Sequence, residues 1–142
     1  MLSRTFRLLA AFSVVVALVG FSVLAMQKKT VKIGIGPWGG QHIHLDIEAK
    51  TATIEFDCAH GTIKGPLVTD AKGNFSLKGT YAPERRGPVR SDDAAAAEQA
   101  AVYSGSVQGQ TMTLSMRLEG QDSPLETFTL TQGKTGKIRK CM

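Results

Sequence analysis

The chain has 142 residues, of which 42% are hydrophobic and 20% are charged, and its formal net charge is +5 at pH 7. This length allows one domain with a small core. Part of the positive charge, Arg4 and Arg7, lies in an apolar N-terminal segment. The remaining excess is too weak to predict nucleic-acid binding.

Residues 1–27 are predicted to form an apolar helix that precedes the domain. Arg4 and Arg7 give a positive start, and residues 8–26 are almost entirely apolar. Val23-Leu24-Ala25 places small residues at the two positions that a signal peptidase recognises, which favours a signal peptide cleaved after Ala25. The same run is at the short end of the roughly 17–25 residues that span a bilayer, so a retained transmembrane anchor is the alternative. Both interpretations export the remainder: periplasmic or secreted, or anchored to the inner membrane by residues 8–26.

Both cysteines, Cys58 and Cys141, follow this segment. An even cysteine count in an exported chain predicts a disulfide. Closing a loop of that length stabilises a fold by roughly 4–5 kcal/mol on the loop-entropy description. There is no Cys-x-x-Cys pair, so redox chemistry is not predicted.

The rest of the chain alternates apolar and polar residues with a period of two, which is typical of half-buried strands. Ile43, Leu45 and Ile47 are predicted to face inward from a strand at 41–50. Further strands are predicted at 51–58, 62–68, 75–81, 102–107, 112–118, 125–131 and 137–141. About eight short strands at tight spacing predict an all-β fold, an antiparallel meander forming a small barrel or a sandwich.

Two stretches interrupt this β domain of residues 41–142. Residues 28–40 are predicted as a linker with a possible first strand. Glycines in this segment match the Gly-x-Gly-x-x-Gly motif of dinucleotide-binding sites, but a strand is predicted after them where that motif requires a helix, so no such site is predicted. Residues 82–100 are predicted as an insert, either mobile or with a short helix over 94–100 that Ser91-Asp92-Asp93 would cap.

Gly36-Pro37-Trp38, ahead of the strand at 41, resembles the Gly-x-Trp that opens lipocalin-like and avidin-like (calycin) barrels. The resemblance implies a basic residue on the last strand that packs over Trp38, here Arg139 or Lys140. The stretch from Phe56 to Leu67, with the Gly-Thr-Tyr at 79–81 and the terminal Lys-Cys, resembles small exported bacterial proteins of no assigned function. That second resemblance implies no activity.

The histidines are the clearest candidates for a metal site. His42 and His44 are two residues apart on a predicted strand, which directs both to one face. His60, in the predicted turn after the neighbouring strand, would add a third ligand, and Asp46 or Asp57 a carboxylate. The alternatives are an ordinary solvated strand face and, for His60, a side chain that bonds to the turn backbone.

Inward apolar residues suggest either a ligand pocket or a plain core. The first hypothesis is a non-enzymatic binding module that holds a small apolar ligand or lipid in the barrel mouth. The second is an envelope structural or protein-interaction domain with a filled core and no ligand, and the third is a metal-dependent enzyme. No catalytic motif or cofactor signature is present, so an enzyme is not predicted. The candidate ligand-binding residues are Trp38, Met112, Met116 and Phe128.

The C-terminal tail is basic through Lys134, Lys137, Arg139 and Lys140. We expect either a solvated edge kept soluble by lysine or a contact with an anionic partner such as a lipid headgroup. For the latter, the tail would lie near the end of the domain that faces the membrane.

Overall fold

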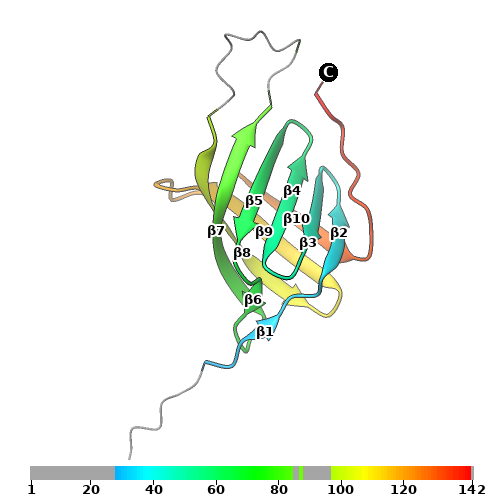
Figure 1. Cartoon of the computed structure of the whole chain (residues 1–142), viewed down its shortest axis with the longest axis vertical. Coiled ribbons are helices and arrows are strands. Elements are labelled where there is room, and N and C mark those ends of the chain that lie inside the picture. Colours follow the sequence, from blue (N-terminus) through cyan, green and yellow to red (C-terminus); the bar gives the residue numbers. More distant parts are fainter. Residues whose placement is uncertain (1–27, 85–86, 88–96, 142) are drawn as a thin grey trace, which may run out of the picture.

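The computed structural model describes residues 28–84, 87 and 97–141 (Figure 1). The predicted N-terminal helix and most of the predicted insert lie outside these residues. None of the described segments is a helix of the length and apolarity needed to cross a membrane.

The fold is a closed antiparallel barrel, as the strand spacing predicted, and a sandwich is ruled out. Its strands follow one another around the barrel in the order β10-β2-β3-β4-β5-β7-β8-β9. The strands are β2 (Gly36–Gly40), β3 (Ile43–Ile47), β4 (Thr51–Phe56), β5 (Ala59–Lys64), β7 (Asn74–Pro83), β8 (Gln99–Gln108), β9 (Thr111–Leu118) and β10 (Glu126–Gln132). A separate two-stranded ribbon pairs β1 (Val31–Lys32) with β6 (Val68–Thr69).

Because successive barrel strands run in opposite directions, the connections gather at two ends. We call one the disulfide end: it carries the β2–β3, β4–β5 and β9–β10 connections and the C-terminus. The other, the N-terminal end, carries the β3–β4 and β8–β9 turns and the β1–β6 ribbon. Figure 1 shows these ends at opposite extremes of the barrel, with β1 at the bottom and the C-terminus at the top.

Side chains fill the interior of the barrel. Ile43, Leu45 and Ile47 are buried, as predicted, and Trp38 and Tyr103 are 1% and 0% exposed. The polar groups of these two buried rings both form hydrogen bonds: Trp38 Nε1 donates to Gly34 O at 2.9 Å, and Tyr103 Oη donates to Thr80 O at 2.6 Å. Burial raises the pKa of the Tyr103 hydroxyl, which keeps it protonated as a donor. The interior is therefore a packed core and not an open cavity.

The barrel begins earlier than the sequence predicted. Residues 36–40 are not a linker: they form β2, which pairs with both β3 and β10 and closes the barrel. Trp38 faces Leu45 on one side and Gln132 on the other. The predicted first strand at 30–35 is reduced to β1.

Three other boundaries differ from prediction. His60 lies on β5, because the β4–β5 turn is Asp57-Cys58 and not Ala59-His60-Gly61. The predicted strand at 62–68 ends at Lys64, and only the short β6 follows it. Strand β7 continues to Pro83 and β8 begins at Gln99, so the insert is shorter than the predicted 82–100. The last two residues of the helix predicted over 94–100 belong to β8 instead.

Residues 137–141 are not a barrel strand. After β10 the chain crosses the outside of β2 and β3, where Lys137 N donates to Gly40 O and His42 N donates to Lys137 O, both at 2.9 Å. Gly39 and Gly136 meet at this crossing, and a Cβ on either would collide with backbone of the opposite segment. The tail ends in the predicted disulfide between Cys58 and Cys141, whose Cα atoms are 5.2 Å apart.

We predict that replacing both cysteines (Cys58→Ser with Cys141→Ser) lowers the free energy of unfolding by about 4 kcal/mol, because the closed loop is long. Urea unfolding followed through Trp38, the single tryptophan of the chain, measures this change. Reductant should bring the wild type to the midpoint of the double variant and leave the variant itself unchanged. Equal midpoints for oxidised wild type and variant would contradict the prediction.

Candidate functional site

A pocket of about 530 Å³ opens at the disulfide end, in the mouth of the barrel. Strands β4, β7 and β9 end there and β5 and β10 begin there, so five strands supply its wall. Its lining residues are His42, Phe56, Asp57, Cys58, Ala59, Tyr81, Met116, Leu125 and Glu126. We call it the mouth pocket.

The floor of the mouth pocket is apolar and aromatic. Met116 is only 3% exposed, and the Phe56 ring contacts two others: Tyr81 edge-on at 5.8 Å and Phe128 at 5.4 Å between centroids. Such ring clusters are rigid, since each ring is held by its neighbours. Leu125 stands at the rim, 52% exposed, and is one of three large hydrophobic residues exposed in the described chain.

One side of the rim is polar and is organised by Asp57. Its Oδ2 accepts from His42 Nδ1 at 2.6 Å, and its Oδ1 accepts from the backbone N–H of Arg139 at 2.8 Å. These bonds, led by that of Arg139, lower the pKa of Asp57 below its ordinary value of 3.8. Asp57 thus ties the β2–β3 turn and the C-terminal tail to the mouth.

His42 has a left-handed backbone with φ of 64°, which costs a side-chain-bearing residue roughly 1–2 kcal/mol. Its backbone N–H bond to Lys137 and its ring bond to Asp57 hold it in this conformation. At the opposite part of the rim, partial burial and the negative charge of Glu126 raise the pKa of Tyr81, so its hydroxyl remains a hydrogen-bond donor.

The structure separates the four predicted ligand-binding residues. Met116 lines the mouth pocket, whereas Trp38 borders a different pocket, of about 410 Å³, at the N-terminal end. Met112 and Phe128 are buried in the core and border neither. Nothing in the sequence marks Phe56, Tyr81 and Leu125 as pocket residues. The alternation of apolar and polar residues predicts that Phe56 faces inward, but it does not indicate which end of the strand is open.

The three predicted metal ligands each have a different partner. His42 bonds to Asp57, His44 Nδ1 accepts from Gly136 N at 3.2 Å, and His60 Nδ1 lies 3.3 Å from Glu84. Across the described residues, no three His, Cys, Asp or Glu side chains converge in a way that would hold a metal ion. His42 is in the turn before β3, so the predicted two-residue spacing along one strand face does not apply to it.

The two basic residues proposed to cover Trp38 do not lie on the last strand, since β10 contains neither lysine nor arginine. Lys140 lies at the disulfide end, 3.4 Å from Glu84 and 3.7 Å from Glu55. The tail ends at the opposite end of the barrel from residue 28 (Figure 1), and its position relative to a membrane stays a prediction.

Comparisons of the chain with protein-family models, with curated proteins and with solved structures give no match. The calycin resemblance therefore rests on Gly36-Pro37-Trp38 alone. What the mouth pocket can bind follows from its own geometry.

We predict that Asp57→Asn, which keeps the shape but removes the charge, destabilises the protein at pH 7. The folded-state pKa of Asp57 is lowered, so its stabilising effect is present above its ordinary pKa and is lost as pH falls through the folded value. The difference in unfolding midpoint between wild type and variant should thus shrink from pH 7 to about pH 2.

The amide of Arg139 gives a local readout of the same interaction. Its hydrogen exchange should be faster in the variant at pH 7, because a neutral amide oxygen is a weaker acceptor than a carboxylate. A difference in stability that persists unchanged at low pH would show that the charge is not responsible.

Proposed function

We propose that the protein is a non-enzymatic binding module that holds a small, largely apolar ligand or lipid chain in the mouth pocket. The observation that carries the proposal is an open pocket of about 530 Å³ with an aromatic floor and an exposed leucine on its rim. This volume is within the range of roughly 300–1,000 Å³ that small-molecule sites occupy.

The packed core limits how deeply such a ligand enters. Phe56 and Met116 close the floor, and the buried Phe128 ring packs against Phe56. The ligand therefore lies in the mouth with one side exposed. Its apolar part would contact Tyr81, Met116 and Leu125.

The polar rim favours a ligand with a polar end that is not anionic. Asp57 and Glu126 place carboxylates at the rim, and these would repel a carboxylate or phosphate headgroup. A hydroxyl, amide or amine would find acceptors there. We assign the pocket no reaction, since His42 and Asp57 bond to each other and to the tail.

We further propose that the domain functions outside the cytoplasm. The disulfide between Cys58 and Cys141 supports an oxidising compartment. The apolar stretch at 8–26 and the small residues before residue 26 favour export, with either cleavage or anchoring.

A structural or protein-interaction domain with no ligand is the second candidate. The observation in its favour is that buried side chains fill the barrel interior, so that a ligand would find space only at the surface of the described chain. In that case the exposed Leu125 and its surroundings would contact another protein.

We predict that the neutral apolar fluorophore N-phenyl-1-naphthylamine binds the protein and that Leu125→Asp weakens this binding about tenfold. Half-burial of a leucine contributes on the order of 1.4 kcal/mol, which corresponds to that factor. Fluorescence titration gives both dissociation constants.

Ile35→Asp is the control, because Ile35 is also an exposed apolar residue (67%, against 52% for Leu125) but lies at the opposite end of the barrel. This variant should bind the fluorophore as the wild type does. If the wild type does not bind, or if the two variants lose affinity equally, the pocket is not a ligand site and the second candidate is favoured.

A further inference from the structure

The N-terminal end of the barrel exposes apolar side chains that no described residue covers. Val31 is 51% exposed and Ile35 is 67% exposed, which makes them two of the three exposed large hydrophobic residues in the described chain. Beside Ile35 lies an apolar groove of about 380 Å³, bordered by Ile33, Ile47 and Leu67. A cluster of this kind on a protein surface indicates an interaction site.

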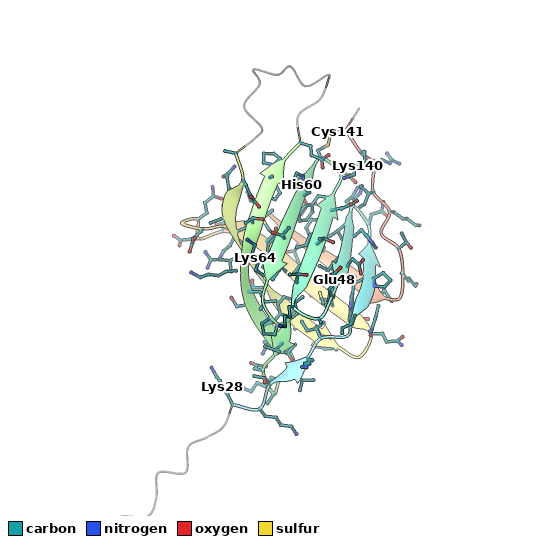
Figure 2. The ribbon with its side chains drawn as sticks, in the orientation of Figure 1. Lys28, Glu48, His60, Lys64, Lys140 and Cys141 are labelled. Carbon is teal, nitrogen blue, oxygen red and sulfur yellow. A yellow bond between two sulfur atoms is a disulfide. The ribbon has the colours of Figure 1, made fainter. Side chains whose placement is uncertain are left out.

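Lysines surround these apolar residues. They come from the segment leading into β1, from the β3–β4 turn, from the end of β5 and from the turn before β7. Figure 2 shows Lys28 on the segment that leaves the barrel beyond β1, on the opposite side from Cys141. The lysines are Lys28, Lys29, Lys32, Lys50, Lys64 and Lys72.

The six lysines do not form ion pairs with neighbouring carboxylates in the described chain, although Lys72 lies close enough to Asp70 to lower its pKa electrostatically. Lys140, by contrast, pairs with Glu55 and Glu84 at the disulfide end. The two carboxylates in the turns of the N-terminal end have local partners. Asp70 accepts from the backbone N–H groups of Lys72 and Asn74, and Glu48 accepts from Thr51.

We propose that the N-terminal end, defined by Val31, Ile35 and the six lysines, docks on an anionic lipid surface. Lysine ammonium groups would contact headgroup phosphates, and the two apolar side chains would enter the interfacial region between them. Clustered lysines are attracted to anionic leaflets, and exposed apolar groups add the non-electrostatic part of such binding.

The course of the chain agrees with this orientation. Residue 28 lies at the N-terminal end, so the apolar stretch at 8–26 is joined to the barrel on the side with the lysines (Figure 1). The mouth pocket lies at the other end. Docking as proposed would leave the pocket facing away from the lipid.

The test compares two tryptophan reporters in the full chain, Ile35→Trp and Leu125→Trp. Both replace exposed residues, at opposite ends, and Trp38 supplies a buried background that the wild type measures. Each protein is mixed with vesicles of brominated phosphatidylcholine, with and without phosphatidylglycerol, and fluorescence quenching is recorded. Because both reporters carry residues 8–26, a difference between them reports which end meets the lipid.

We expect the reporter at position 35 to be quenched about twofold more in anionic than in zwitterionic vesicles, since lysines supply the attraction. The reporter at position 125 should be quenched weakly in both. Equal quenching of the two reporters, or equal quenching of the first in both kinds of vesicle, would overturn the proposal.

A charge reversal tests the lysines directly. Lys32→Glu with Lys50→Glu, in the Ile35→Trp background, should remove the extra quenching by anionic lipid. Lys78→Glu with Lys140→Glu is the control of equal charge change, because Lys78 pairs with Glu119 and Lys140 pairs with Glu55 and Glu84, away from the N-terminal end. If the control variant loses as much quenching as the double reversal, net charge and not this surface is responsible, and the proposal fails.

Discussion

The fold depends on the close approach of three backbone segments along β2. Its residues pair with β3 on one side and with β10 on the other, which closes the barrel. A Cβ at Gly40 would collide with Thr129 O of β10, and a Cβ at Gly39 would collide with the tail at Thr135 and Gly136. Trp38, on the same strand, is buried and fills part of the core. Closure of the sheet, attachment of the tail and packing of the interior thus require glycine at positions 39 and 40 and a large ring at position 38.

The tail links this seam to the disulfide end. Its bonds to Gly40 and His42 hold the β2–β3 turn, and Arg139 bonds to Asp57 in the β4–β5 turn before the chain reaches Cys141. The left-handed backbone at His42 is held in place by these contacts. The polar side of the mouth pocket is therefore built by the tail, although the tail contributes no side chain to the pocket lining.

Strands in which apolar and polar residues alternate regularly could be predicted from the sequence, because a strand with one buried face carries an apolar residue at every second position. Strands β3, β4, β9 and β10 are of this kind. Strand β2 could not be predicted in this way, because its glycines and proline give no alternation of apolar and polar residues. The glycines are required by contacts with residues about a hundred positions further along the chain. The glycine that follows His60 favours a turn, yet Gly61 lies within a strand where Thr80 O and Tyr103 Oη leave no space for a side chain. The disulfide could be predicted from the number of cysteines alone. The mouth pocket could not, because it depends on which strand ends lie together, and this is set by the pairing of strands that are far apart in the sequence.

The antiparallel meander gives the two ends of the barrel different chemistry. At the disulfide end carboxylates, lysines and histidines pair with one another around an aromatic pocket. At the N-terminal end the lysines have no such partners among the described residues, and apolar side chains stand between them. A packed core separates these surfaces, so no channel joins them through the barrel. We expect a ligand at the mouth and a lipid surface at the N-terminal end to be bound independently, because the two surfaces share no residue and a close-packed core lies between them.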